Sequence, residues 1–189
     1  MAFCINATNH HHPTPTTHHP SPKPPPITQH PNYIMQQEKT LVLLKPCTVQ
    51  RSLIGEIISI FEKKGLKIVG LKMMQLDEAI LKEHYSHLAS KPFFPILRDS
   101  MMVTPVIAMA LEGIDAIEVV RQMAGPTNGR KAAPGTIRGN YSMSGQENIV
   151  HASDSPETAT AELKRFFKDE ELFSYDMPHL LAFYAKDEL

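Results

Sequence analysis

The chain has 189 residues, and its 19 lysines and arginines nearly balance its 20 aspartates and glutamates. This balance argues against a protein that uses bulk positive charge to hold nucleic acid or anionic membrane, and no run approaches the roughly 20 apolar residues of a membrane span. The length suits one domain with an appendage, and two cysteines, Cys4 and Cys47, cannot form a disulfide framework, so we expect a soluble protein for which a reducing compartment is permitted.

The first 37 residues differ in composition from all that follow. They contain eight prolines between positions 13 and 31 and six of the ten histidines, and no acidic residue precedes Glu38. Such a segment has too little apolar surface to offset the entropy of ordering it, which predicts a disordered tail over 1–37. A more specific alternative is that the histidines of this tail bind a metal ion.

The two ends of the sequence leave more than one cellular compartment open. The start lacks the charged and apolar regions of a secretory signal peptide, whereas an acid-free, threonine-rich tail leaves organelle import as an alternative. The last four residues, 186–189, spell the ER-retention address, which acts only on a protein that enters the ER. We expect a cytoplasmic protein.

Regular periodicity begins after the tail. "TLVLLK" (40–45) is a continuous apolar run that favours a strand covered on both faces. Apolar residues at helical spacing then predict a helix over 53–65, followed by a strand over 66–76. Asp77 is an N-cap residue for a helix over 78–88.

In the second half of the chain, strands and helices again alternate. A short segment beginning near Pro92 leads to a strand over 105–111 and a helix over 115–124. Residues 125–147 predict a long irregular loop, and a loop of that length inside a compact domain is usually functional. It contains "GPTNGRKAAPGTIRGN", with cationic side chains among prolines and glycines.

The last strand carries Ile149 and Val150, and Ser155-Pro156 predicts the start of the final helix. His151 therefore lies at a strand-to-helix junction. Leaving aside the helix near 78–88, the order is βαββαβ. This order predicts an α+β, ferredoxin-like fold: a four-stranded antiparallel sheet with helices packed on it and a long loop before the last strand.

The residues around His151 suggest phosphate chemistry. A neutral imidazole can attack phosphorus directly, and Glu162, 11 residues later on the next helix, could hold one ring nitrogen protonated. Arg121, Thr127 and Arg138 are candidates to position a polyphosphate. The sequence contains no P-loop and no G-x-G-x-x-G motif, so a nucleotide would have to be bound by a different kind of phosphate site. It also contains no H-E-x-x-H and no paired C-x-x-C motif, so no metal held by the protein is indicated.

"NIVHASDS" (148–155) resembles the active-site signature of nucleoside diphosphate kinases, and the resemblance extends over about 38–175. Further blocks occur in the family's order: "KP", "VQRSLIGEI", "EHY", "KPFF" and "PGTIRG". The resemblance implies a domain over 38–175 with a C-terminal extension over 176–189. It also implies a ping-pong phosphotransferase that passes the γ-phosphate of a nucleoside triphosphate to a nucleoside diphosphate.

The resemblance also implies roles for single residues. His151 would become phosphohistidine, with Glu162 orienting its ring, Ser153 supporting that arrangement and Tyr85 beside the transferred group. The other implied contacts are phosphate binding by Arg121, Thr127 and Arg138, sugar contacts by Lys45 and Asn148, and base stacking by Phe93. Mg²⁺ would arrive on the phosphates rather than in a protein cage.

Four departures from the family's pattern stand near these positions. Cys47-Thr48 stands where the family usually has Asp-Gly, and Ala152 stands where it has a glycine. Gly145 replaces an apolar residue that would cover the second face of the base. Gly129 replaces a proline in a loop that, in the family, helps to join subunits. The family implies a homo-oligomer, a hexamer or a tetramer.

Two other functions remain as alternatives. The first is a catalytically weakened, family-like interaction or regulatory module, in which the altered turn impairs turnover and the proline-rich tail recruits partners. The second is an RNA-binding sheet. It is disfavoured because the strand over 105–111 lacks the exposed aromatics that such a sheet uses and because the charge is balanced.

Overall fold

A computed structural model describes residues 37–188. The tail predicted over 1–37 lies outside the described residues except for Gln37, which begins the first strand. The last residue of the address, Leu189, also lies outside them.

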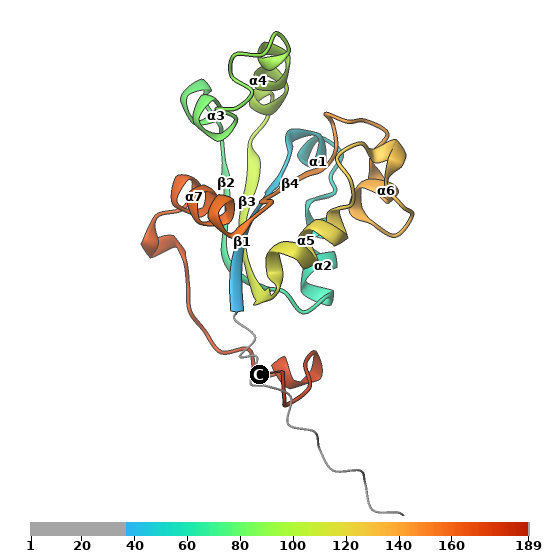
Figure 1. Cartoon of the computed structure of the whole chain (residues 1–189), viewed down its shortest axis with the longest axis vertical. Helices are drawn as coiled ribbons and strands as arrows, with labels where there is room; N and C mark the ends of the chain where they lie inside the picture. The colour runs from blue at the N-terminus through green and yellow to red at the C-terminus, as the bar shows by residue number, and fades with distance from the viewer. Residues whose placement is uncertain (1–36, 189) are drawn as a thin grey trace, which may run out of the picture. The chain divides into compact units, whose positions relative to one another are not determined.

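Four antiparallel strands form one sheet with the order β2-β3-β1-β4 (Figure 1). Their bounds are Gln37–Leu44 for β1, Lys67–Met74 for β2, Val106–Ile114 for β3 and Val150–Ala152 for β4. The two central strands, β1 and β3, pair over the full length of β1. The predicted α+β, ferredoxin-like fold with a four-stranded antiparallel sheet is confirmed.

Helices connect these strands. The α-helices are α1 (Pro46–Gln50), α2 (Ile54–Lys63), α3 (Glu78–His84), α4 (Phe94–Met102), α5 (Ala116–Ala124), α6 (Ile137–Tyr141) and α7 (Pro156–Phe166). Single 3₁₀ turns are η1 (Gly129–Lys131), η2 (Asp169–Glu171) and η3 (Leu180–Ala182).

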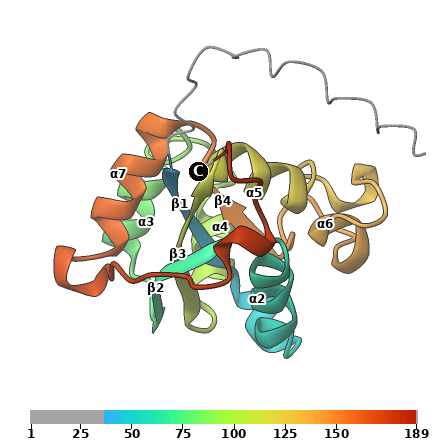
Figure 2. The same ribbon diagram turned by 90° about the horizontal axis from the view of Figure 1, so that it is seen from below.

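The sheet lies between two helical layers (Figure 2), and β1 shows why both faces are covered. Leu41 and Leu43 belong to a core shared with α3, α4 and α7, whereas Val42 and Leu44 belong to a core shared with α2 and α5. All four side chains are fully buried. A strand that is buried on both faces has no polar alternation, which is the pattern that predicted it.

Both predicted caps are confirmed. Asp77 accepts a hydrogen bond from the Ile80 N–H at 2.9 Å, and the Ser155 hydroxyl accepts one from the Thr158 N–H at 3.1 Å. These bonds satisfy backbone donors that the first turn of a helix leaves unpaired. Ser155 thereby starts α7 three residues after β4 ends, which fixes the short connection beyond His151.

Three helices were missed by the sequence analysis. The segment after Pro92 was expected to be a connection, but it forms α4, whose start carries a second proline at an early helical position that tolerates one. The loop over 125–147 was expected to be wholly irregular. It contains η1 and α6, and α6 starts where the Thr136 hydroxyl accepts a hydrogen bond from the Gly139 N–H. The turn after Lys45 forms α1.

The segment after α7 follows the free edge of β2. The Phe173 N–H donates to the Val69 carbonyl at 2.7 Å, and the Tyr175 hydroxyl donates to the Ile68 carbonyl at 2.8 Å. Further along, the Phe183 ring packs so closely on Gly65 that a Cβ there would lie 2.8 Å from it. Residues 173–175 thus cover part of an edge strand that would otherwise expose unpaired backbone groups, and the extension packs on the turn before that strand.

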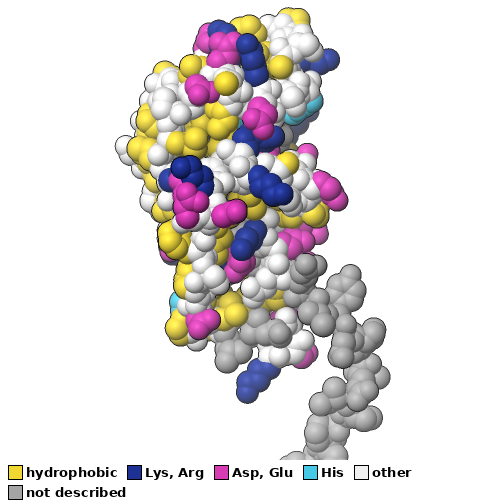
Figure 3. Space-filling model, turned by 90° about the vertical axis from the view of Figure 1, so that its left-hand side faces the viewer, with side chains coloured by type: hydrophobic (Ala, Val, Ile, Leu, Met, Phe, Trp, Pro, Cys, Tyr) yellow, Lys and Arg dark blue, Asp and Glu magenta, His cyan; other side chains and the backbone are white. Residues whose placement is uncertain are grey.

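The surface carries mixed charge. On the face drawn in Figure 3, basic and acidic side chains are interspersed with apolar area. Within residues 37–188, no helix combines the length and the apolar character needed to cross a membrane.

Candidate functional site

A cavity of about 1180 Å³ collects the predicted site residues. All of them except Ser153 line it, although they come from helices, strands and loops spread over more than half of the chain. Ser153 is fully buried behind the cavity wall. The sequence-predicted positions are therefore one site in space.

His151, Glu162 and Ser153 form a hydrogen-bonded chain. His151 Nε2 lies 2.9 Å from Glu162 Oε1, and the Ser153 hydroxyl donates to Glu162 Oε2 at 2.6 Å. Ser153 Oγ in turn accepts a hydrogen bond from the backbone N–H of Leu41 in β1. The central strand, β4 and α7 thus fix the orientation of the imidazole together.

The charge of Glu162 is maintained although the residue is buried. Burial alone would raise the pKa of Glu162, but the hydrogen bond and charge of His151 and the hydrogen bond from Ser153 outweigh it, so the pKa of this carboxyl is lowered. A carboxylate can only accept hydrogen bonds, so His151 must carry its proton on Nε2. In the neutral ring, Nδ1 then holds the free lone pair.

A strained residue precedes the histidine. Ile149 has φ of 73°, which is rare for a β-branched side chain. Its carbonyl accepts two hydrogen bonds, from the Lys45 N–H at 2.9 Å and from the Thr48 hydroxyl at 2.5 Å. These bonds anchor the peptide two residues before His151. Thr48 was not among the predicted site residues, and its only signal in the sequence was its place in a departure from the family's pattern.

Lys45 and Asn148 lie together at one side of the cavity. Burial, followed by the nearby Arg138 charge, lowers the pKa of Lys45 to about 8, and its Nζ donates to the Gln146 carbonyl at 3.1 Å. The Asn148 amide nitrogen donates to the carbonyls of Thr127 and Gly145. Its Oδ1 is buried and has no hydrogen-bond partner among the residues that the structure describes. That oxygen is left to accept a bond from a ligand.

Arg138 lines the cavity and also makes hydrogen bonds that hold the long loop over 125–147. It donates to the carbonyls of Asn148 at 3.2 Å, Val150 at 2.8 Å and Gly125. Burial, with a smaller contribution from the charge of Arg121, lowers the pKa of Arg138 to about 10. Arg138 therefore ties the long loop to β4. Its guanidinium has five N–H groups, so donors remain for a ligand.

Arg121 and Thr127 are exposed and line the cavity beside Arg138. Arg121 is near the end of α5, and Thr127 lies just beyond that helix. Arg121 lies close enough to Arg138 for its charge to lower the pKa of Arg138, and two such guanidinium groups suit an anion of multiple charge.

Phe93 and Tyr85 contrast in exposure. Phe93 is 49% exposed at the cavity, whereas its neighbour Phe94 is only 4% exposed and belongs to the core. Tyr85 is 9% exposed with its ring centroid 6.3 Å from that of His151, and burial raises its pKa. A Cβ built on Gly145 would meet no described atom within 4 Å, so the cavity is open there.

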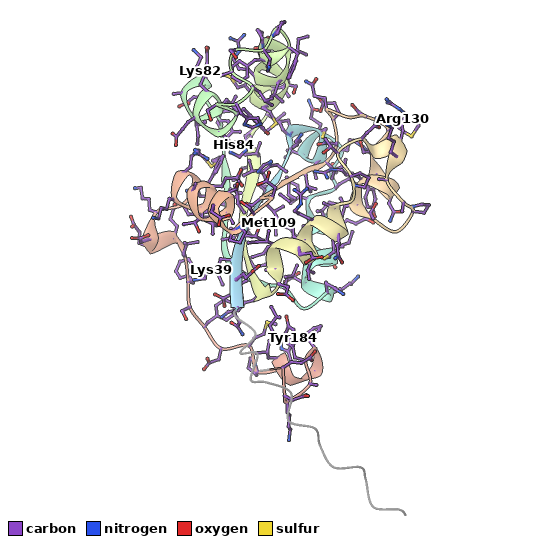
Figure 4. The ribbon with its side chains drawn as sticks, viewed as in Figure 1. Lys39, Lys82, His84, Met109, Arg130 and Tyr184 are labelled. Atoms are coloured by element: carbon purple, nitrogen blue, oxygen red, sulfur yellow. The ribbon has the colours of Figure 1, made fainter. Side chains whose placement is uncertain are left out.

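His84 is a second residue that the sequence analysis missed. Its ring lies 4.5 Å, centroid to centroid, from that of His151, and its Nδ1 is 3.5 Å from Glu162 Oε1. Figure 4 shows His84 at the end of α3, next to α7. Its place directly before Tyr85 in "EHY" was the available signal.

Two departures are accommodated locally. Ala152 is within β4 and is not among the described residues with positive φ, so no glycine is needed after the histidine. At position 129, the N–H donates to the Ser144 carbonyl at 3.0 Å, and a Cβ would lie 2.3 Å from the Ser142 carbonyl oxygen. A proline there could make no such bond.

Comparison with known proteins gives consistent matches. The family model described as nucleoside diphosphate kinase matches residues 38–172. A nucleoside diphosphate kinase of Parabacteroides distasonis is 68% identical over 151 residues, which are 80% of this chain and 99% of that protein. One of Staphylothermus marinus is 57% identical over 141 residues, which are 75% of this chain and 100% of that protein.

Solved structures agree in fold. A halophilic nucleoside diphosphate kinase of Halobacterium salinarum in complex with CDP superposes with a TM-score of 0.77 at 43% identity, over 79% of this chain and 99% of that one. A transition-state mimic of the enzyme of Borrelia burgdorferi, with bound vanadate and ADP, gives a TM-score of 0.73 at 36% identity, over 77% of this chain and 96% of that one.

Proposed function

The chain belongs to the nucleoside diphosphate kinase family, and we propose that His151 Nδ1 is the atom that carries the phosphoryl group during its reaction. The protein transfers the γ-phosphate of a nucleoside triphosphate to a nucleoside diphosphate. The observation that supports the proposal most is the 2.9 Å contact of His151 Nε2 with Glu162, because it leaves only Nδ1 with a lone pair.

The first half-reaction consumes the triphosphate. The Nδ1 lone pair attacks the γ-phosphorus, a P–N bond forms, and the bond from that phosphorus to the bridging oxygen breaks. The diphosphate leaves with the bridging oxygen and its electron pair. Phosphorylated His151 bears positive charge on the ring, and Glu162 stabilises that charge through Nε2–H. The second half-reaction reverses these steps with a different diphosphate.

The other residues position the nucleotide. Arg121, Arg138 and Thr127 bind the phosphates, and Tyr85 lies beside the transferred group. Lys45 and the free Oδ1 of Asn148 contact the sugar hydroxyls.

Phe93 stacks on the base. A stacked ring has little base preference because every base offers a π-face, so we expect broad nucleotide use. The second face of the base meets open space at Gly145, which makes the base clamp one-sided.

The divalent ion that such phosphotransfer uses is Mg²⁺ in this proposal, and it enters as part of the nucleotide. The cavity wall has cationic groups at Arg121 and Arg138 and four carboxylates, those of Glu83, Asp154, Glu157 and Glu162. Glu83 is paired with Arg165, and Glu162 is bonded to His151 and Ser153, so the wall does not make a dedicated oxygen cage for Mg²⁺. When bound, the ion neutralises phosphate charge.

Assembly and compartment belong to the same proposal. We expect a homo-oligomer, a hexamer or a tetramer, because the edge strand β2 exposes Leu71 by 50% and Met73 by 57%. We place the protein in the cytoplasm, since two cysteines cannot form a disulfide framework and a reducing compartment is therefore permitted. The kinase domain spans 38–175, with 176–189 as its extension.

Labelling tests the proposed carrier. After incubation with γ-labelled ATP, the protein should hold an acid-labile, base-stable phosphoryl group that GDP or CDP removes. His151→Gln should take up none. Equal labelling of that variant would refute the assignment of His151, and an unlabelled wild-type protein would favour the interaction-module alternative.

A further inference from the structure

His84, His151 and Glu162 form a compact cluster of metal-binding atoms. One ring nitrogen from each histidine and one carboxylate oxygen all lie within 4.8 Å of one another. Two of the separations are 2.9 Å, from His151 Nε2 to Glu162 Oε1, and 3.5 Å, from His84 Nδ1 to the same oxygen. Zinc bonds of about 2.0–2.2 Å place tetrahedral ligand atoms roughly 3.3 Å apart, so these separations bracket the required value.

The His84 ring packs against Tyr85 and Phe166, but its nitrogen atoms make no hydrogen bond within the described part of the chain. Its side chain is 1% exposed, and neither ring nitrogen has a hydrogen-bond partner among residues 37–188. Buried polar groups are normally paired, so two unpaired nitrogens in one buried ring require an explanation. Burial, followed by the charge of His151, lowers the pKa of His84 to about 3, which keeps the ring neutral. A neutral imidazole is the form that binds metal.

The surroundings allow a cation to reach the cluster. All three residues line the cavity described above. Arg165, whose charge acts on His84, is paired with Glu83 at 2.8 Å, which reduces its repulsion of a cation. Glu162 supplies the negative charge.

We propose that His84, His151 and Glu162 bind one late-transition divalent ion of the Zn²⁺ class, and that the bound ion blocks phosphorylation of His151. Two imidazoles and one carboxylate with an open fourth position suit Zn²⁺ or Co²⁺, whereas Mg²⁺ prefers an all-oxygen octahedral shell. The site is distinct from that of the Mg²⁺ which enters on the phosphates.

The block follows from the number of free lone pairs on the His151 ring. A neutral imidazole has one free in-plane lone pair. When the metal takes the Nε2 lone pair, the ring proton moves to Nδ1, and the Nδ1 lone pair that would attack phosphorus is lost. This step rests on the proposed function, since it requires that Nδ1 of His151 be the acceptor.

The binding test uses the full-length chain with the six histidines before Glu38 replaced by asparagine, so that the tail cannot compete for metal. Titration with Co²⁺ should produce visible ligand-field absorption that saturates at one equivalent, and Zn²⁺ should abolish it by displacement. His84→Phe, which keeps a ring of similar size against Phe166, should weaken Zn²⁺ binding by at least about tenfold. The matched control is His87→Phe, at an exposed residue of the same cavity.

Retention of the spectrum in His84→Phe, or no saturable spectrum in the tail-substituted chain, would overturn the site. The block is tested separately by phosphoryl uptake from labelled ATP, with each variant compared with itself in the presence and absence of Zn²⁺. Uptake should fall in proportion to Zn²⁺ occupancy and recover on chelation. Full uptake at full occupancy would overturn the block. A metal-free chain that takes up no phosphoryl group would instead overturn the proposed function, and the Co²⁺ spectrum would still decide the site.

Discussion

Single residues determine which nitrogen of His151 can react. Glu162 is ionised, it is held on its other oxygen by Ser153, and it faces Nε2 at 2.9 Å. Each of these facts is needed, because a protonated carboxylic acid or a freely rotating ring would leave the tautomer undefined. In the proposed mechanism, the chemistry of the site therefore depends on one carboxylate behind His151.

Glu162→Ala removes this orienting bond. A hydrogen bond to a charged group contributes about 1.5–3 kcal/mol, and we expect kcat to fall roughly 10- to 100-fold. KM should change little, because Glu162 does not bind the nucleotide. Steady-state kinetics check this, with Glu157→Ala as the control at an exposed residue of the same helix and cavity. Equal losses in the two variants would contradict the assigned role.

The lowered pKa of Lys45 predicts a pH effect. With a pKa of about 8, the side chain is charged below that pH and neutral above it. We expect kcat/KM, which reports the free enzyme, to fall as the pH rises through about 8. Lys45→Arg stays charged and should lack this alkaline decline, even if its overall activity is lower. The same decline in both proteins would mean that another group titrates.

In the proposed nucleotide site, Gly145 leaves the face of the base opposite Phe93 uncovered. Gly145→Val adds apolar surface opposite Phe93, and partial burial of that side chain contributes about 1 kcal/mol, so KM for nucleoside diphosphates should fall roughly fivefold. Gly145→Ser is the control, because it adds a side chain with little apolar surface. A higher KM for the valine variant would show that the base lies elsewhere.

The elements differed in how far the sequence could predict them. β1 and β3 are buried on both faces, so their apolar runs stand out, and Asp77 and Ser155 mark helix starts by local chemistry. The helix α4 was hidden because prolines at its start suggest a turn. His84 was missed for a different reason: it stands in the "EHY" block, but that block does not indicate its burial against α7, which is a tertiary contact.

The turn from β1 into α1 acts on the site through one carbonyl. Thr48→Val keeps the shape of the side chain but removes the hydroxyl bond to the Ile149 carbonyl. We expect a loss of about 1 kcal/mol in the free energy of unfolding, together with a lower kcat, because Ile149 holds its strained φ next to β4. Denaturant titration and kinetics measure the two effects.

Thr160→Val is the control for that variant. Its hydroxyl also donates to a backbone carbonyl, that of Pro156, but on the exposed side of α7. If Thr48→Val behaves like this control, Thr48 does not support the site.

At the scale of the whole molecule, the residues of the proposed site all lie between positions 45 and 165, inside the segment matched by the family. A chain that begins at Ile34 keeps β1, including Glu38, whose carboxylate accepts a bond from the Ile117 N–H at the start of α5. We expect this shorter chain to retain the kcat of the full-length protein. A loss of activity with retained folding, measured by circular dichroism, would mean that the tail contributes to catalysis.

The identity of the phosphorylated nitrogen tests the central claim most directly. Nuclear magnetic resonance of the phosphoenzyme formed from ATP distinguishes a phosphoryl group on Nδ1 from one on Nε2. The account predicts a single phosphohistidine at His151, bonded through Nδ1 and discharged by a nucleoside diphosphate. A phosphoryl group on Nε2 of His151, or on any other residue, would contradict it.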